Sequence, residues 1–177
     1  MPRRRRWLAP FVALAVPCAG ADAATLEQNP LAVHAAQAKA MRALVQRSEQ
    51  RRERATKIRA VVRRARAQIG DAYAYGAGGP DAFDCSGLTA YAFARAGVRL
   101  PHTSYGQAVL GRRVARRHIR PGDLVFFSTA GSGASHVGIA VSRKRVVSAT
   151  NAGVMQHATD DAYWGGHYVT ARRVRAR

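Results

Sequence analysis

The sequence predicts an α+β domain, because helical patterns fill its first half and strand patterns fill its last third. Apolar residues recur at helical spacing between Ile58 and Ile69, with arginines between them. After the turn at Pro121-Gly122-Asp123, short apolar runs alternate with turn residues. Runs of this kind, so close together, favour antiparallel strands packed against the preceding helices.

The first residues have the pattern of an export signal. Arg3 to Arg6 form a basic start, Trp7 to Val16 form an apolar run, and Ala21-Asp22-Ala23 has the small residues of a cleavage site. The apolar run is too short, and too interrupted by proline, to anchor the chain in a membrane. We therefore expect residues 1–23 to be a signal peptide and the rest to be exported to the periplasm, the cell wall or the medium.

The chain is strongly basic, with 29 Lys and Arg residues against 10 Asp and Glu and a formal net charge of +19. Such an excess favours a polyanionic partner: nucleic acid, anionic lipid or an anionic wall polymer. Residues 24–57 have few apolar side chains and are read as a basic helical arm or linker, with Leu31 to Thr56 a largely solvated helix. Runs of charged residues usually form the solvent-exposed face of a helix, so no nucleic acid is expected as a partner. We also expect a monomer without a transmembrane span.

Residues 58–177 contain the regular pattern of a compact domain. Glycines end the first two expected helices, at Gly70 and Gly97, and residues 71–83 read as a shaped loop. The expected helices cover 58–69, 89–96 and about 104–110, and the expected strands cover 124–127, 136–141, 145–149 and 168–174.

Cys85 is a candidate nucleophile. Loss of the signal peptide removes Cys18 and leaves Cys85 as the only cysteine, so no internal disulfide can form. It lies where a glycine-rich loop leads into a helix, and the unpaired N–H groups and dipole of a helix start lower the pKa of a thiol. A thiolate attacks carbonyl carbon well. The alternative is a buried structural cysteine, although its neighbours Asp84, Ser86 and Gly87 are polar or small.

A cysteine nucleophile needs a base, and six histidines are candidates. His136 follows a Gly/Ser loop and begins the apolar strand His-Val-Gly-Ile-Ala-Val, a position that holds a side chain rigidly at a sheet edge. The other five lie in the arm, in connections or in polar segments: His34, His102, His118, His157 and His167. Position alone favours His136 without deciding the question.

Four motifs occur in one order along residues 58–175. They are Asp84-Cys85-Ser86-Gly87-Leu88, Leu100-Pro101-His102-Thr103-Ser104, Pro121-Gly122-Asp123-Leu124-Val125-Phe126-Phe127 and His136-Val137-Gly138-Ile139. Together they resemble the NlpC/P60 family of cell-wall cysteine peptidases. The resemblance implies a papain-like fold, with the cysteine on a helix packed against a small antiparallel sheet. It also implies hydrolysis of peptidoglycan stem peptides, typically between γ-D-glutamyl and a diamino acid such as meso-diaminopimelate.

The resemblance also assigns roles to residues. Cys85 matches the nucleophile and His136 the base, while Tyr73 matches a tyrosine that helps to hold the oxyanion, together with the backbone N–H of Cys85. Asp84 matches an acid that pairs with the free amino group of a stem peptide. Ser86 belongs to the same substrate-binding or oxyanion region, or serves packing. No cofactor is implied, and no spacing resembles a metal site.

One position departs from the family pattern. The third catalytic residue, which orients the imidazole, is often His on the strand after the histidine strand, and the residue there is Ser148. Either Ser148 orients His136 weakly, or a carbonyl, a water or Asn151 does so. Two other readings of the whole chain stay open: a wall- or nucleic-acid-binding module without catalysis, and an acyl- or amide-transferring enzyme that uses the same Cys–His pair.

Overall fold

The computed structural model describes residues 30–175, and the expected signal peptide lies outside this range. The chain divides into two compact units, residues 1–46 and 47–177. Helix α2, Pro30–Arg66, runs through the boundary. The two helices expected at 31–56 and 58–69 are therefore one, because no glycine or proline interrupts the sequence between them. None of its residues before Val61 is buried, as expected for a solvated basic helix.

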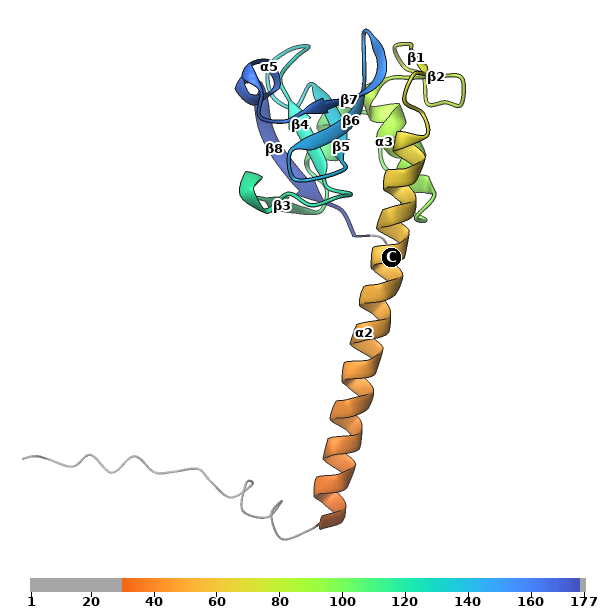
Figure 1. Ribbon diagram of the computed structural model, residues 1–177, viewed down its shortest axis with the longest axis vertical. Coiled ribbons are helices and arrows are strands. Elements are labelled where there is room, and N and C mark those ends of the chain that lie inside the picture. The colour runs from red at the N-terminus through yellow and green to blue at the C-terminus, as the bar shows by residue number, and fades with distance from the viewer. Residues whose placement is uncertain (1–29, 176–177) are drawn as a thin grey trace, which may run out of the picture. The chain divides into compact units, whose positions relative to one another are not determined.

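The second unit is built on a six-stranded antiparallel sheet (Figure 1). Its strand order is β3-β8-β4-β5-β6-β7, so the last strand of the chain lies between the first two strands of the sheet. The strand bounds are β3 Arg112–Val114, β4 Leu124–Phe127, β5 His136–Ala140, β6 Arg145–Thr150, β7 Gly153–Ala158 and β8 Tyr168–Arg173. The α+β prediction is confirmed.

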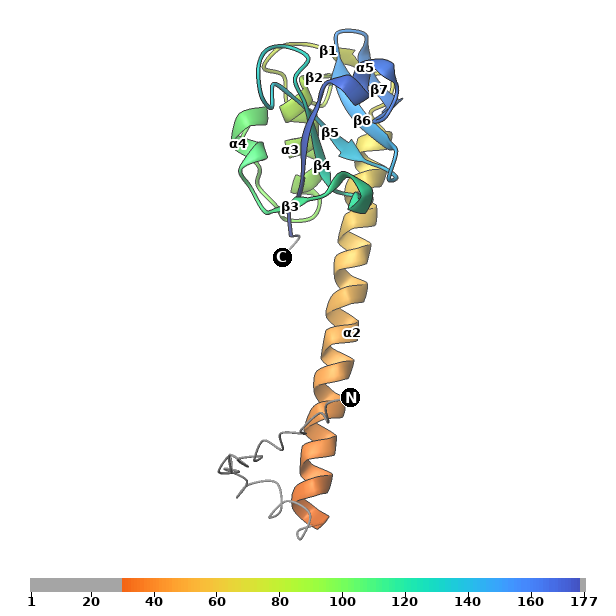
Figure 2. The ribbon, with the colours of Figure 1, turned by 90° about the vertical axis from the view of Figure 1, so that its left-hand side faces the viewer.

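Apolar cores cover both faces of the sheet. On one face, helix α3, Cys85–Ala94, packs against β5 and β6, and Val61 and Ala65 of α2 join the same core (Figure 2). On the other face, a smaller core forms around Phe127, Ala140 and Val146, and Trp164 packs against it from α5, Ala162–Gly166. The alternation of side chains along each strand therefore divides the sheet residues between two environments.

The remaining elements are short. Strands β1, Ala72–Tyr73, and β2, Ala82–Phe83, form a parallel pair just before α3. Helix α4, Ser104–Ala108, and the 3₁₀ turn η1, Arg116–His118, lie in the connection between α3 and β4. Strand β7, α5 and the two-residue strands were not expected from the sequence, since elements this short or this polar carry little periodicity.

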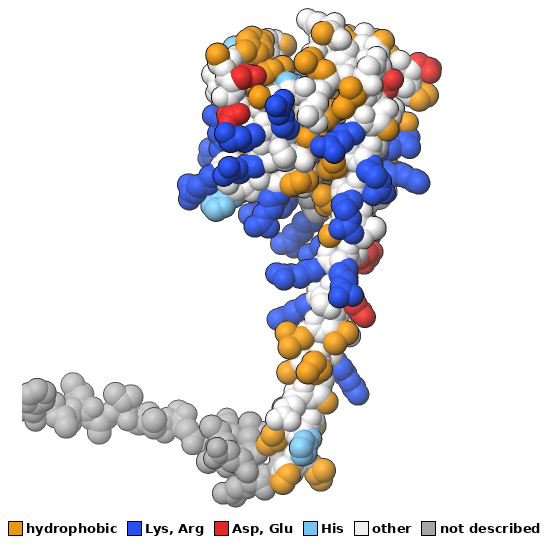
Figure 3. All heavy atoms as spheres, in the orientation of Figure 1, with side chains coloured by type: hydrophobic (Ala, Val, Ile, Leu, Met, Phe, Trp, Pro, Cys, Tyr) orange, Lys and Arg blue, Asp and Glu red, His pale blue; other side chains and the backbone are white. Residues whose placement is uncertain are grey.

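Arginines dominate the surface of the second unit. Figure 3 shows Lys and Arg side chains over much of the visible face, with few acidic ones between them. Asp123 is buried, and Arg173 donates to both of its carboxylate oxygens, at 2.6 and 2.7 Å. Asp123 also accepts from the N–H of Arg120 and so closes the turn at Pro121-Gly122-Asp123. No helix within residues 30–175 has the length and hydropathy of a membrane span.

Candidate active site

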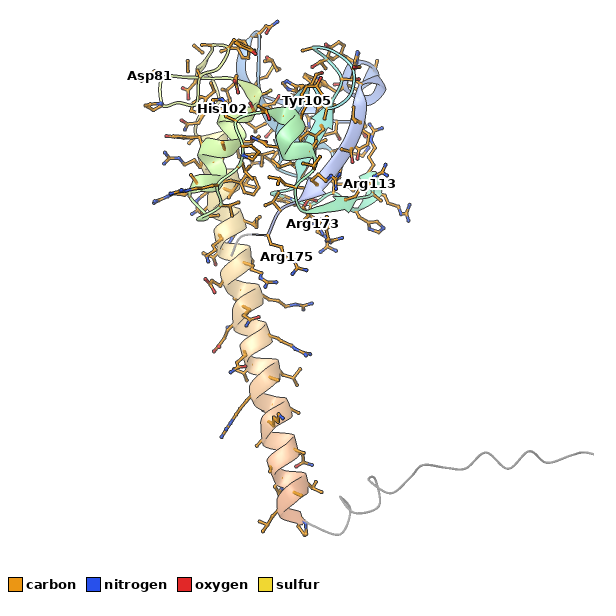
Figure 4. All side chains as sticks on the ribbon, turned by 180° about the vertical axis from the view of Figure 1, so that it is seen from behind. Asp81, His102, Tyr105, Arg113, Arg173 and Arg175 are labelled. Carbon is orange, nitrogen blue, oxygen red and sulfur yellow. The ribbon has the colours of Figure 1, made fainter. Side chains whose placement is uncertain are left out.

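An open cleft of about 870 Å³ lies in the second unit, at the end of the sheet where α3 begins. Cys85, the first residue of α3, and His136, the first residue of β5, both line it. The β6–β7 turn and helix α5 also contribute to its walls. Tyr105 and His102 form part of the wall beside α4, and Figure 4 shows them at the opposite end of the unit from Arg113, Arg173 and Arg175.

Asp84 fixes the start of α3. Its carboxylate accepts from the N–H of Gly87 at 2.6 Å and from the Ser86 hydroxyl at 2.9 Å, so it caps the helix N-terminus. It also accepts from the N–H of Gly76 at 3.0 Å and from Nε2 of His102 at 3.1 Å. Asp84 is only 8% exposed, and these four bonds occupy it within the protein. Ser86, predicted as a substrate-binding or oxyanion residue, has its hydroxyl committed to Asp84.

Close packing holds the first turn of α3 in place. A methyl group at Gly87 would overlap the carbonyl oxygen of Ala77 and would lie 2.8 Å from Nε2 of His102. On the other side, the buried amide of Gln107 donates to the carbonyl oxygens of Ser86 and Pro101, at 3.0 and 2.8 Å. The position of Cys85 is therefore determined by both the preceding loop and α4.

The Cys85 sulfur is half-buried, and burial raises the pKa of its thiol. The nearby Asp84 charge raises it further, whereas hydrogen bonds from the backbone N–H groups of Val137, Ser86 and Cys85 itself lower it. The net shift is upward. The sequence predicted a lowered pKa because it shows only the N–H groups of the helix start. Burial and the position of the Asp84 charge, which raise the pKa, depend on the fold.

The imidazole of His136 is almost fully enclosed, with 7% of the residue exposed. Burial, reinforced by the neighbouring His157, lowers its pKa to about 4. Its Nε2 atom is buried and has no hydrogen-bond partner among the described residues. With a raised thiol pKa and a lowered imidazole pKa, both groups are neutral near pH 7. The two side chains share the cleft wall but are not hydrogen-bonded to each other.

Tyr73 lies beside the sulfur. Strand β1 pairs with β2, which leads directly into Asp84 and Cys85, so this pairing brings the ring to the cleft wall. Burial and the adjacent Cys85 and Asp84 raise the pKa of its hydroxyl, which therefore stays protonated. A protonated phenol can donate a hydrogen bond to an oxyanion formed next to the sulfur.

Ser148 lies outside the cleft wall, fully buried on β6. Its hydroxyl makes a 2.8 Å hydrogen bond with Nε2 of His157, not with His136. His157, on β7, stacks on the Trp164 ring at a centroid distance of 3.6 Å, and the same ring lies 5.4 Å from that of His136. Trp164 therefore packs against the sheet and also lines the cleft.

Two histidines have contacts at this site although the sequence did not predict a role for them there. His102 reads as a loop residue, yet it pairs with Asp84 and lines the cleft. His157 reads as part of a polar segment, yet it is 5% exposed and faces the site from β7. Val154 and His157 are buried but Met155 and Gln156 between them are exposed, so this strand carries no regular alternation that the sequence could show. Within residues 30–175, no group of acidic, Cys and His side chains is arranged to hold a metal ion.

Comparisons with known proteins agree on one family. The NlpC/P60 family matches residues 70–173. The probable endopeptidase p60 of Listeria monocytogenes is 43% identical over 114 residues, covering 64% of this chain and 23% of the relative. The bifunctional muramidase/DL-endopeptidase CwlT of Bacillus subtilis is 35% identical over 109 residues, which cover 60% of this chain and 33% of CwlT. The chain thus spans about a quarter to a third of the length of these relatives.

Solved structures show the same fold. The peptidoglycan hydrolase RipB of Mycobacterium tuberculosis superposes with a TM-score of 0.61 at 29% identity, covering 72% of this chain and 69% of that one. A protein of Staphylococcus aureus described as similar to lipoprotein, NLP/P60 family, superposes with a TM-score of 0.63 at 26% identity. The match covers 69% of this chain and 42% of that one. The residues matched by the family, 70–173, include the start of α3 and strand β5. The chain belongs to the NlpC/P60 family.

Proposed function

We propose that the protein is a peptidoglycan hydrolase, a cysteine endopeptidase that cleaves an amide bond of the stem peptide. The observation that carries the proposal is the cleft, in which a cysteine at a helix start and a histidine at a strand start face the same open space. The relatives named as endopeptidases and the peptidoglycan hydrolase among the solved structures support the substrate class.

The reaction begins from the neutral pair. As the Cys85 sulfur attacks the amide carbonyl carbon, His136 takes the thiol proton. The carbonyl oxygen becomes an oxyanion, which the Tyr73 hydroxyl and the backbone N–H of Cys85 stabilise by hydrogen bonds. The N–H of Cys85 is available because the first turn of a helix has no internal partner for it.

His136 then returns the proton to the leaving amine nitrogen, the C–N bond breaks and a thioester remains on Cys85. Water attacks the thioester while His136 accepts its proton. The tetrahedral intermediate expels the sulfur, which regains a proton from His136, and the carboxylic acid product leaves. One amide bond and one water are consumed for each free amine and carboxylic acid formed.

For the scissile bond we propose the link between γ-D-glutamyl and a diamino acid, meso-diaminopimelate. The support is the likeness to CwlT, a DL-endopeptidase by name. Asp84 and His102 stand in the cleft wall as a carboxylate–imidazole pair. A substrate amino group that reaches Asp84 has to compete with His102 for the same carboxylate oxygen.

The basic surface supports attraction to anionic wall material, and residues 1–23 support export to the periplasm or the cell wall. The attraction is salt-dependent, because exposed charges are screened within about 8 Å at physiological ionic strength. The exposed Arg113 and Arg175 lie away from the cleft wall, so wall material attracted to them does not cover the cleft (Figure 4).

Digestion of purified muropeptides tests the proposal. The wild-type protein is expected to release diaminopimelate-containing peptides, identified by mass, and Cys85→Ala and His136→Ala are expected to release none. His118→Ala, a change at an exposed residue of η1, is the matched control and should keep full activity. A wild-type protein that is folded but cleaves no wall type would contradict the proposal, and so would an active Cys85→Ala variant.

A further inference from the structure

The buried nitrogen of His136 limits how its imidazole can act as a base. For a histidine to take a proton from Cys85 through one ring nitrogen, its other nitrogen has to carry the hydrogen. Nε2 of His136 is sealed from solvent, which leaves Nδ1 for the cleft. A buried N–H without an acceptor costs about 1–3 kcal/mol. The useful tautomer, with hydrogen on Nε2, therefore needs an acceptor on the sheet side of the ring.

Ser148 is placed to be that acceptor. Strands β5 and β6 pair with Ile139 opposite Val147, so Gly138 stands opposite Ser148 and His136 lies two residues further along on the same face. A methyl group at Gly138 would lie 3.0 Å from Cβ of Ser148. Because Gly138 has no side chain, nothing from β5 stands between the imidazole and the hydroxyl. Diagonal neighbours of this kind are within reach of long side chains.

A serine alone, however, is an ambiguous partner, because its hydroxyl can donate as well as accept. If Ser148 donates to Nε2 of His136, the ring hydrogen moves to Nδ1 and the histidine can no longer take the thiol proton. An acceptor of fixed direction would prevent this. In the Ser-His-Asp enzymes, replacing the fixed acceptor so that the wrong tautomer forms lowers kcat by about 10⁴.

His157 determines the direction in which the Ser148 hydroxyl donates its hydrogen. Its Nδ1 lies 2.8 Å from the carbonyl oxygen of Ala158, which can only accept, so Nδ1 carries the hydrogen. Burial lowers the pKa of His157 and keeps it neutral, so its Nε2 has a free lone pair. The hydroxyl hydrogen of Ser148, 2.8 Å away, therefore points to His157. The Ser148 lone pairs are left for another donor.

We propose that His157 is a positioning residue of the active site, which turns Ser148 into a one-way acceptor for the Nε2–H of His136. The order of hydrogen bonds is His136 Nε2–H to Ser148, Ser148 O–H to His157 Nε2, and His157 Nδ1–H to the Ala158 carbonyl. The inference rests on the proposed function only for its effect on rate. The structure shows the first of these bonds open, and a turn of the His136 ring would close it, in the free protein in solution as well as with substrate bound.

The surroundings favour such a turn without loss of the arrangement. Phe127 and Trp164 contact both imidazoles, with Phe127 at centroid distances of 6.2 and 5.8 Å from His136 and His157. Trp164 stacks on His157 and holds its ring in one plane. The ring of His136 is less closely held, at 5.4 Å from Trp164. His157 is thus fixed, and His136 keeps the freedom that proton transfer needs.

Nuclear magnetic resonance of ¹⁵N-labelled protein tests the inference without substrate. In the wild type, His157 is expected to carry its hydrogen on Nδ1, and His136 on Nε2. In His157→Phe, which keeps the shape but removes the acceptor, His136 is expected to gain the Nδ1–H tautomer. An unchanged His136 tautomer in both His157→Phe and Ser148→Ala would overturn the inference. This outcome is independent of whether the protein cleaves peptidoglycan.

Kinetics on muropeptides provides the second test. His157→Phe is expected to lower kcat about 10- to 100-fold with little change in KM, because positioning partners of catalytic imidazoles have effects of this order. His157→Gln presents an amide oxygen to the Ser148 hydroxyl and should recover most of the loss. Val154→Ala, a buried change on the same strand toward the other core, is the control for simple loosening. Equal losses in His157→Gln, His157→Phe and Val154→Ala would refute a positioning role.

Discussion

The enclosed imidazole of His136 makes a quantitative prediction about acid stability. A histidine that stays neutral when buried binds a proton more weakly in the folded chain than in the unfolded one. Its contribution to stability is complete above the unfolded pKa of about 6.5 and is lost as pH falls toward the folded value. That folded pKa is about 4, so the loss takes place between about pH 6.5 and 4.

The magnitude follows from the two pKa values. A difference of about 2.5 units corresponds to about 3.4 kcal/mol, at about 1.36 kcal/mol for each unit. Between pH 7.5 and 4.5, about 2.5 kcal/mol of this is lost, since the proton binds the unfolded chain at pH 4.5 but only partly binds the folded one. The loss is a large fraction of the stability of an ordinary domain.

Urea unfolding at the two pH values measures the effect, in the wild type and in His136→Gln. The carboxylates and His157 titrate in both proteins, so the difference between the two losses isolates His136. We expect the wild type to lose about 2.5 kcal/mol more than the variant on acidification. Losses that agree to within about 0.5 kcal/mol would refute the reasoning and would mean that the imidazole is hydrated or already protonated.

Two further predictions concern the start of α3. In a Cys18→Ser background, the rate at which iodoacetamide alkylates Cys85 should rise only at alkaline pH. This rate should hardly change in His136→Ala. A fast, constant rate between pH 5 and 7 that is lost in His136→Ala would instead indicate a thiolate–imidazolium pair. Asp84→Ala should lower the free energy of unfolding by about 2–4 kcal/mol, from a lost helix cap and a buried hydroxyl and N–H left without acceptors, whereas the exposed Asp81→Ala in the same loop should change it by less than about 0.5 kcal/mol in a urea titration.

The sequence predicted the central elements because their patterns are local. Leu124–Phe127 is a continuous apolar run between a turn and a glycine loop, and the predicted strand has the bounds of β4. The strand predicted over 136–141 begins, as β5 does, at His136, directly after the Gly/Ser loop. The four motifs identified the family, and residues 70–173 match it. In each case, the information lies within a few neighbouring residues.

The ionisation of the site could not be predicted in the same way. A helix start next to Cys85 is visible in the sequence and lowers a thiol pKa, but the opposing burial is contributed by segments far along the chain. The position of Asp84 also mattered, since its cap holds a negative charge near the sulfur. The sign of the shift depends on which of these effects is larger, and their sizes are set only by the folded structure.

The contact between His157 and Ser148, at the third catalytic position, could not be predicted from local sequence either. Ser148 lies on the strand after His136, at the position of the third catalytic residue in the family pattern. The chain then turns at Asn151-Ala152 and returns as β7, which brings His157 opposite Val146 and beside Ser148. A ring that arrives by strand pairing from nine residues further on has no fixed sequence spacing from the base it serves. Pairing register, not motif distance, connects the two.

The neutral resting pair also bears on how a lone thiol persists outside the cell, where the proposed export would place it. The thiolate is the form that oxidants attack, so a raised thiol pKa slows oxidation along with premature reaction. Proton transfer to His136 then has to coincide with attack on a bound carbonyl. A site built this way gives up part of the reactivity of a permanent ion pair. In return, Cys85 ionises chiefly when an amide is in place to receive the sulfur and Tyr73 can share the charge that forms.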